Sequence, residues 1–377
     1  MAGIYLHIPF CKQACVYCNF HFSTSLNLKA ELLSALHKEV ALQSSYLNGQ
    51  QIETIYFGGG TPSLLHAEEI NQLIETISKH YELSSLKECT LEANPDDLST
   101  TYLKQLKNTP VNRLSIGVQS FYDRDLTYMQ RAHNAQEADY CIKAAQDNEF
   151  TNLTIDLIYG TPGLTDTDWR KNLAKIKELS IPHFSSYALT VEEGTALHHN
   201  INKKAARAVD LSQAADQLTI LMQEAEAMGY EHYEISNLSL PNHYAIHNTN
   251  YWHGKHYLGI GPSAHSFDGK SRRWNIANNA LYIKNISGEG KLNYEEEILS
   301  KTQQINEYIM TALRTKWGID LEKTATQWGS DYCNEIMKNS VRYKEDGYLL
   351  HNANNTLTLT NKGKLIADHI ASELFFL

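Results

Sequence analysis

The sequence has no uninterrupted apolar run approaching the roughly 18 residues that a helix needs to cross a bilayer. Its first residues, MAGIYLHIPFCKQAC, lack a basic segment followed by an apolar one, and Pro9 interrupts them early. These absences argue against a transmembrane anchor and against a secretory signal peptide. We therefore expect a cytoplasmic protein.

The chain also lacks an excess of basic residues, with 33 Lys and Arg against 43 Asp and Glu and a net charge of −10. An acidic chain does not carry the electrostatic surface typical of nucleic-acid binding, so we expect no nucleic-acid partner. Hydrophobic residues make up 42% of the chain, which excludes a disordered protein and supplies a large core. A length of 377 residues predicts two or three domains, or one large barrel with an appendage.

Cysteine is scarce, and its placement is uneven. Cys11, Cys15 and Cys18 fall within eight residues. The other three cysteines are scattered, at Cys89, Cys141 and Cys333. A disulfide framework would need regular pairing in a small secreted chain, which this distribution excludes. Clustered thiols indicate metal ligands or redox groups instead.

Apolar periodicity predicts alternating strands and helices through the first half of the chain. The expected strands span residues 4–8, 54–57, 88–92, 113–117, 153–159 and 183–189. The expected helices span residues 28–46, 67–80, 100–107, 136–148 and 166–179. This alternation predicts an α/β fold built on a partial parallel (β/α) barrel. Polar and glycine-rich segments follow the strands, at the end of a barrel where active sites lie.

The pattern changes after a long helix expected at 205–228. Residues 230–300 are rich in His, Asn, Tyr and Gly with little periodicity, so we expect irregular structure. Beyond residue 301, a helix, a second helix at 328–346 and two short strands predict a small α+β, winged-helix-like module. It holds nine basic and nine acidic residues, which disfavours DNA binding. We divide the chain into a core barrel (1–235), an irregular region packed on it (236–300) and this C-terminal module (301–377).

The spacing Cys-x3-Cys-x2-Cys, directly after a predicted strand, allows three thiolates to hold one metal centre. A structural zinc site would require a fourth ligand, which His7 or His21 could supply. A redox pair of Cys15 and Cys18 would leave Cys11 unexplained. A four-iron cluster on three cysteines keeps one iron free for a small ligand, so this spacing favours a [4Fe-4S] cluster.

The segment HIPFCKQACVYCNF (7–20) resembles the cluster motif of radical S-adenosylmethionine (SAM) proteins, and its flanks resemble the oxygen-independent coproporphyrinogen III oxidase family. The match continues in the same order through YFGGGTPS (56–63), TLEANPDD (90–97), RLSIGVQSF (113–121), QRAHN (130–134), IDLIYGTPG (155–163) and YALTVEEGT (187–195). The resemblance implies a radical SAM barrel that binds SAM at the free iron through its amino and carboxylate groups. Electron transfer then cleaves SAM to methionine and a 5′-deoxyadenosyl radical.

The resemblance also implies a set of SAM contacts. Gly59, Gly60 and Thr61 would receive the methionine end, since glycines after a strand let a ligand approach the backbone. Arg131 would pair with the SAM carboxylate through its fork of donors. The remaining SAM residues implied by the resemblance are Tyr5, Tyr17, Glu92, Gln119, Asp156, Ala188 and His265. A tight turn, polar side chains that close the barrel and core tyrosines are the simpler structural alternatives.

Three features separate two groups within this family. The oxidases carry a further cysteine two residues after the third cluster cysteine, where this chain has Phe20, and they carry an N-terminal extension that is missing here. HNTNYW (247–252) resembles the HNxxYW motif of the family's haem chaperones. That resemblance implies His247 as an axial haem ligand, with Tyr251 and Trp252 against the macrocycle. A loop with core aromatics is the alternative, and other nearby ligand candidates are His243, His253, His256 and His265.

We therefore expect a haem chaperone that delivers haem to apo-haemoproteins, including respiratory and membrane-associated ones, and that retains a [4Fe-4S] cluster and SAM. Oxidative decarboxylation of coproporphyrinogen III by a SAM-derived radical is the competing enzymatic hypothesis. A structural zinc protein that binds partners through its C-terminal module is a third. The resemblance also allows a homodimer.

Overall fold

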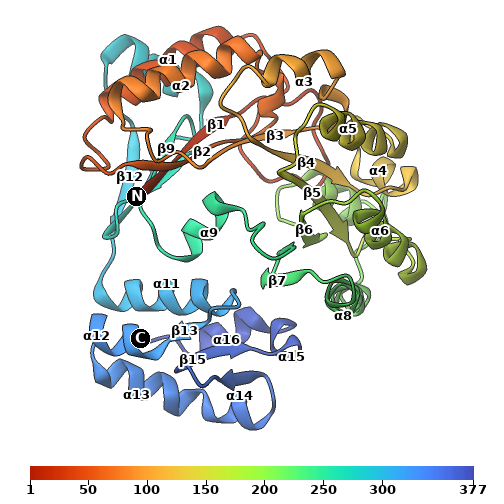
Figure 1. The fold of residues 1–377 in the computed structure, drawn as a ribbon, viewed down its shortest axis with the longest axis vertical. Coiled ribbons are helices and arrows are strands. Elements are labelled where there is room, and N and C mark those ends of the chain that lie inside the picture. The colour runs from red at the N-terminus through yellow and green to blue at the C-terminus, as the bar shows by residue number, and fades with distance from the viewer.

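The computed structural model describes residues 1–377 and contains one large twelve-stranded sheet. Its strand order is β12-β11-β10-β9-β1-β2-β3-β4-β5-β6-β8-β7, with β12 and β7 as unpaired edges, so the barrel is open. The central strands run parallel and are β1 (Ala2–Ile8), β2 (Ile52–Gly59), β3 (Glu88–Ala93), β4 (Arg113–Gln119), β5 (Leu153–Tyr159) and β6 (His183–Ala188). The predicted α/β partial barrel is confirmed (Figure 1).

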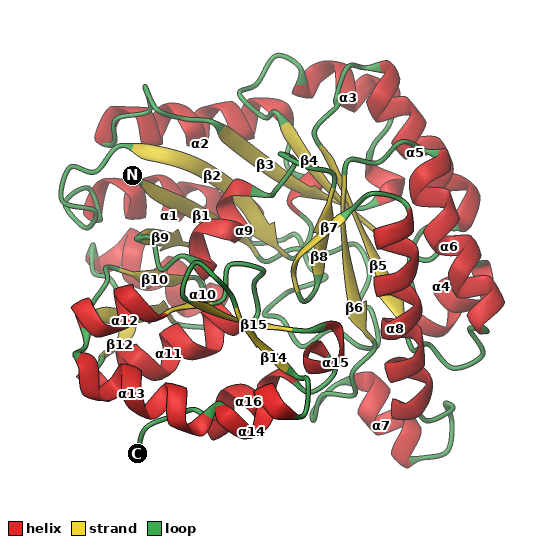
Figure 2. Ribbon diagram, turned by 60° about the horizontal axis from the view of Figure 1, so that its bottom comes forward, coloured by secondary structure: helices red, strands yellow, loops and turns green.

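Helices cover the outer face of this sheet (Figures 1 and 2). They are α1 (Lys29–Leu42), α2 (Ala67–His80), α3 (Thr100–Leu106), α5 (Ala135–Asp147), α6 (Asp166–Glu178) and α8 (Leu211–Ala227), whereas α4 (Asp123–Met129) and α7 (Ala196–Asn202) pack against the loop after β1. The short α4 and α7 were not predicted. The long helix predicted at 205–228 is wrong at its start, because the Asp210 side chain accepts hydrogen bonds from the backbone N–H groups of Ser212 and Gln213 and so caps α8.

The central strands separate apolar from polar side chains by simple alternation. On β1, Ile4, Leu6 and Ile8 are fully buried members of an apolar core of 60 residues. The alternate residues on β1 and β2 face the inside of the barrel, where Tyr5 contacts Tyr56. The barrel therefore has an apolar shell against the helices and a polar interior.

The irregular structure predicted for residues 236–300 is wrong, because this region extends the sheet at both edges. It supplies β8 (Asn237–Ser239), β9 (Tyr257–Ile260), β10 (His265–Phe267), β11 (Ser271–Asn275) and β12 (Tyr294–Ile298), while β7 (Glu231–Glu234) precedes it. β9 pairs in parallel with β1, from the other end of the chain. Strands of three to five residues are too short to show a periodicity in the sequence. The same region contains α9 (Ile246–Trp252).

The C-terminal module has its own apolar core of 16 residues between Ile305 and Leu374. Its sheet has the order β13-β15-β14, with β13 (Ile319–Asp320), β15 (Thr356–Leu359) and β14 (Leu349–His351). Its helices are α11 (Lys301–Leu313), α12 (Leu321–Gln327), α13 (Ser330–Asn339), α14 (Val341–Glu345), α15 (Asn361–Lys364) and α16 (Ala367–Glu373).

The single helix predicted at 328–346 is wrong, since α13 and α14 are separate. Between them lies the buried Ser340, whose hydroxyl donates to the carbonyl of Met337. Such local side-chain bonds compete with the helical ladder. The three-part division of the chain stays a prediction. None of the helices combines the length and the apolar character that crossing a membrane requires.

Candidate functional site

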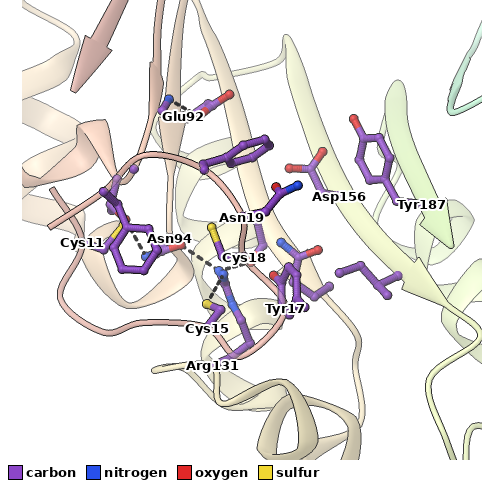
Figure 3. A pocket seen from close by; sticks show the side chains of 18 of the residues that line it. Cys11, Cys15, Tyr17, Cys18, Asn19, Glu92, Asn94, Arg131, Asp156 and Tyr187 are labelled. Atoms are coloured by element: carbon purple, nitrogen blue, oxygen red, sulfur yellow. Dashed lines mark hydrogen bonds between the residues drawn. The ribbon is translucent and has the colours of Figure 1, made fainter. Parts of the chain in front are cut away.

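A cavity of about 430 Å³ lies at the carboxyl ends of the parallel strands (Figure 3). Side chains from the loop after β1 and from the ends of β2 to β6 form its walls. Most of the site residues predicted from the sequence line this one cavity: Cys11, Cys15, Cys18, Tyr17, Gly59, Gly60, Thr61, Glu92, Gln119, Arg131, Asp156 and Ala188. Residues that are up to 177 positions apart in the chain (188 − 11) therefore share one wall.

The three thiols of the motif lie on the loop after β1, and all three are free. Val16, in the middle of this loop, donates its N–H to the carbonyl of Met129 and accepts from the N–H of Leu197. Val16, Met129 and Leu197 also belong to one small apolar cluster. This cluster anchors the thiol loop to α4 and α7, neither of which was predicted from the sequence.

Arg131 links the thiol loop to the strand ends (Figure 3). Its Nη1 lies 3.3 Å from the Sγ of Cys15, and its Nη2 donates to the Oδ1 of Asn94 at 2.7 Å and to the carbonyl of Gly117 at 2.8 Å. The Nδ2 of Asn94 donates to the Oγ1 of Thr61 at 3.2 Å. The Nε of Arg131 is buried without a partner. The guanidinium is thus held in place with a donor still available.

Sequence reasoning missed Asn94 as a site residue. It lies two residues after Glu92, and residues two apart in this extended segment point to the same side. That spacing within the quoted segment TLEANPDD was the signal that could have found it. The cavity wall also includes Ser115, Gly117 and Tyr187, which were not predicted either.

Glu92 is held at the end of β3 by two hydrogen bonds. One carboxylate oxygen accepts from the Tyr56 hydroxyl at 2.7 Å, and the other accepts from the backbone N–H of Gly59 at 3.2 Å. Desolvation inside the barrel raises the pKa of Glu92 to about 7 and that of Asp156 to about 6. Two carboxyl groups that titrate near neutral pH therefore face the same cavity.

Gln119 reaches the cavity through an unusual backbone conformation. It ends β4 with a φ of 66°, in the left-handed region that non-glycine residues rarely adopt. Its side chain is nearly buried and lines the cavity. Strained residues of this kind concentrate at functional sites, so the conformation supports a binding role for this strand end.

Packing of the protein backbone requires a glycine at position 60. A Cβ at this position would lie 2.6 Å from the carbonyl oxygen of Phe10 and 2.9 Å from that of Ile8. The N–H of Gly60 also donates to the Ile8 carbonyl at 2.9 Å. A close approach between two backbone segments of the protein therefore requires glycine here, and the predicted approach of SAM to this residue, which also lines the cavity, stays a prediction.

Two predicted SAM residues lie outside the cavity wall. Tyr5 stacks on Tyr56 with ring centroids 6.0 Å apart, and its hydroxyl is hydrogen-bonded to the Nδ1 of His7. His265 is exposed on β10, with its ring 6.0 Å from that of Trp274. The structure does not bring either side chain to the walls formed by the other predicted residues.

The HNTNYW segment forms α9, which lies at the opposite end of the barrel. The Glu88 carboxylate, at the first residue of β3, accepts from the backbone N–H groups of Ile246 and His247 at 2.8 and 2.9 Å. A carboxylate at a helix N-terminus satisfies donors that the helix leaves free. Figures 1 and 2 show α9 between the curved sheet and the C-terminal module.

His247 points into the barrel and is only 2% exposed. Its Nδ1 is hydrogen-bonded to the Thr54 hydroxyl and its Nε2 to the Tyr251 hydroxyl, both at 2.7 Å. Burial lowers the pKa of His247 to about 3, so the imidazole is neutral at neutral pH. Both ring nitrogens are hydrogen-bonded in this arrangement, and His247 as an axial haem ligand stays a prediction.

Trp252 is covered as well. The guanidinium of Arg314, from the C-terminal module, lies 5.4 Å from the centre of its indole ring. Arg314 is held there by an ion pair of 3.0 Å with the buried Glu234 of β7. The indole N–H of Trp252 is buried without a partner. The partly buried Trp252 therefore lies between the barrel and the module.

Comparison with known proteins adds to this geometry. The family model of the radical SAM superfamily matches residues 5–176, and that of the HemN C-terminal domain matches residues 299–366. The protein named heme chaperone HemW of Bacillus subtilis is 32% identical over 373 residues, which cover 98% of each chain. This chain belongs to the HemW family of radical SAM proteins. The HemW of Lactococcus lactis is also 32% identical, over 97% of this chain and 95% of the relative.

The solved structure of coproporphyrinogen III oxidase (HemN) from Escherichia coli superposes with a TM-score of 0.85. The two chains are 22% identical, and the superposition covers 99% of this chain and 90% of the oxidase. At this identity the likeness concerns the fold. This chain and HemN thus share one architecture.

Membership of the radical SAM superfamily implies a [4Fe-4S] cluster and SAM, and the residues of the cavity fit both. Three free thiols on one loop face the cavity beside a guanidinium, which suits an anionic iron–sulfur centre. No three His, Cys, Asp or Glu side chains are arranged as a preformed ion site. Three thiolates on one loop would leave one iron of the cluster free to bind SAM.

Proposed function

We propose that this protein is a haem chaperone, which binds haem and delivers it to apo-haemoproteins, and which holds a [4Fe-4S] cluster and SAM in the cavity at the strand ends. The observation that carries this proposal is the similarity, over almost the whole chain, to proteins named heme chaperone HemW. We propose that the recipients include respiratory and membrane-associated haemoproteins.

The cluster would be held by Cys11, Cys15 and Cys18, and when bound it supplies the electron that cleaves SAM. Arg131 has an unpartnered Nε for the SAM carboxylate, while its Nη2 donates to Asn94 and Gly117 and its Nη1 lies beside the sulfur of Cys15. Glu92 offers a carboxylate to the hydroxyl or amino groups of SAM. Hydrogen bonds within the protein already hold both side chains, Arg131 through Asn94 and Gly117 and Glu92 through Tyr56 and Gly59.

The position that carries a further cysteine in the oxidase pattern supports the chaperone reading. Here it is Phe20, which lines the mouth of the cavity with 68% of its surface exposed. An exposed aromatic ring offers a flat apolar surface to a ligand or a partner and brings no thiol chemistry. This difference disfavours the decarboxylase.

Haem binding at HNTNYW needs a second arrangement of α9. An iron can bind a nitrogen of His247 only if that nitrogen gives up its hydrogen bond to Thr54 or Tyr251. We propose that α9 moves away from the barrel and that His247, Tyr251 and Trp252 then hold the macrocycle. Each neutral hydrogen bond contributes about 0.5 to 1.5 kcal/mol, and the movement also gives up the α9 contacts to Glu88 and Tyr56, so haem binding has to offset more than one such bond.

The test is a haem titration and a decarboxylation assay on one anaerobically reconstituted sample. We expect haem binding that saturates at a defined stoichiometry, and no conversion of coproporphyrinogen III while cluster and SAM are intact. An unrelated protein of similar size provides the baseline for non-specific haem binding. Decarboxylation at catalytic rates without haem affinity above that baseline would assign the protein to the oxidases.

A further inference from the structure

The polar interior of the barrel connects the two sites. A second cavity, of about 50 Å³, lies deeper in the barrel and shares four wall residues with the larger one: Glu92, Ser115, Asp156 and Tyr187. Its wall also includes Ala245, the residue before α9, and Asn248 of α9. The proposed SAM site and the proposed haem helix are therefore neighbours through the barrel, although they lie at opposite ends of it.

Tyr56 of β2 touches both sites directly. Its hydroxyl donates to the Glu92 carboxylate at 2.7 Å, and its ring stacks on that of His247 with centroids 5.0 Å apart at an angle of 27°. Glu92 and His247 have no hydrogen bond to one another, so Tyr56 is the side chain that joins them. From His247 the contact continues to Tyr251 of the same helix.

We propose that Tyr56 is a positioning residue shared by the two sites, through which SAM binding at Glu92 holds α9 against the barrel and lowers the affinity for haem. This inference rests on the proposed function for the identity of the two ligands. The link itself rests on the hydrogen bond and the ring stack of Tyr56.

The direction follows from the contacts. In the open arrangement proposed above, where α9 moves away from the barrel to bind haem, the His247 ring leaves its place beside Tyr56 and Thr54. A ligand that binds Glu92 orders its carboxylate, and the carboxylate in turn orders the Tyr56 hydroxyl and ring. SAM therefore favours the closed arrangement of α9, which does not bind haem. A ligand that prefers one of two arrangements shifts the population towards it.

Such coupling is reciprocal, so haem must weaken SAM binding by the same factor. Couplings between two sites usually correspond to a change of about five- to 150-fold in affinity. A single hydrogen bond carries this one, so we expect a change near the lower end, about five- to tenfold. In a chaperone, SAM binding would then act as a signal for haem release.

The experiment compares haem affinity with and without saturating SAM in the full-length, anaerobically reconstituted protein. We expect SAM to raise the haem dissociation constant about five- to tenfold in the wild type. Tyr56→Phe keeps the ring stack and removes the bond to Glu92, so SAM should leave its haem affinity unchanged. Tyr81→Phe is the matched control, because the Tyr81 hydroxyl donates to the carbonyl of Gln43, away from both sites. It should behave like the wild type.

A second measurement needs no haem. Amide hydrogen exchange of residues 246–252 should slow when SAM is added to the wild type and to Tyr81→Phe, and should not change in Tyr56→Phe. Unchanged exchange in the wild type, or equal slowing in Tyr56→Phe, overturns the inference. The wild-type comparison decides the coupling even if Tyr56→Phe does not fold. If the protein binds no haem, the proposed function is refuted. Amide hydrogen exchange then still decides whether Tyr56 links Glu92 to α9.

Discussion

The guanidinium of Arg131 lies 3.3 Å from the sulfur of Cys15 and is fixed on its other side by Asn94. The cation that we assign to the SAM carboxylate is therefore also in contact with the thiol loop. Arg131 and Cys15 are 116 positions apart in the chain (131 − 15). Through this contact, Arg131 fixes the position of the thiol loop relative to the proposed SAM site.

Replacing Arg131 by alanine should weaken SAM binding by about 1.5 to 3 kcal/mol, since a hydrogen bond to a charged group is lost. Calorimetric titration of the reconstituted protein with SAM measures this change. Arg124→Ala is the matched control, because Arg124 forms its ion pairs on the outside, with Asp125 and Asp168. Equal SAM affinity in Arg131→Ala and wild type would show that the carboxylate binds elsewhere.

Gly60→Ala should destabilise the protein before any ligand is added. Its Cβ would meet backbone atoms of Phe10 and Ile8, which cannot move aside as a flexible side chain can. Overpacking of this kind costs about 1 to 3 kcal/mol. Thermal unfolding measures the loss, and Gly288→Ala, at a position with open space around it, should unfold like the wild type. Unchanged stability of Gly60→Ala contradicts the packing described here.

Replacing Cys11, Cys15 or Cys18 by alanine should abolish the iron–sulfur cluster, because each supplies one of its three ligands. Iron and acid-labile sulfide analysis should find about four of each per wild-type chain. Alanine variants of the remaining cysteines, Cys89, Cys141 and Cys333, should retain both. Cys89 and Cys141 are buried in the core, and burial raises the pKa of the Cys141 thiol to about 12. Stoichiometric zinc without sulfide contradicts the prediction.

SAM affinity should rise with pH through the titration of Glu92. The pKa of this carboxyl is about 7 in the folded protein, so its ionised form, the better hydrogen-bond acceptor, gains population between about pH 6 and about pH 8. Titrations across this range should show the rise in the wild type and a flatter profile in Glu92→Gln. The pKa of Asp156 is lower, at about 6. Asp156→Asn should therefore keep the rise of SAM affinity that occurs around pH 7.

The same shift affects stability in the absence of ligands. The pKa of Glu92 is raised in the folded state from an ordinary value of 4.5. Its contribution to the free energy of unfolding is therefore fully present below pH 4.5 and is lost as the pH rises through about 7. Glu92→Gln should therefore become more stable relative to wild type as the pH increases across this window. Urea unfolding at several pH values measures the difference, and a constant difference argues against the raised pKa.

His247→Ala should weaken haem binding and change its absorption spectrum, because loss of the imidazole alters the ligand field of the iron. His253→Ala is the informative comparison. Its ring is exposed and lies 4.7 Å from that of Trp317, so it could reach haem without any movement of α9. A spectral change in His253→Ala with none in His247→Ala would place the axial ligand on the surface and remove the need for an open arrangement.

Sequence reasoning succeeded where a local pattern reports a local structure. The repeats from β1 to β6 were predictable because each strand carries buried apolar residues and each following helix shows the longer helical period. The thiol motif was readable because its three ligands lie within eight residues of one loop. The residues at the strand ends were predicted together because parallel strands deliver their carboxyl ends to one face.

Those features, together with the acidic composition, are what the sequence by itself determined. Tertiary structure decided that Asn94 joins Arg131 to Thr61 and that the short strand β9 pairs with β1. It also decided that His247 of HNTNYW lies buried beside Tyr56. The physical reason is that these contacts join segments distant in the chain. Whether a histidine is free to bind a metal depends on which hydroxyl groups surround it after folding. The spacing of residues in a motif does not predict those neighbours.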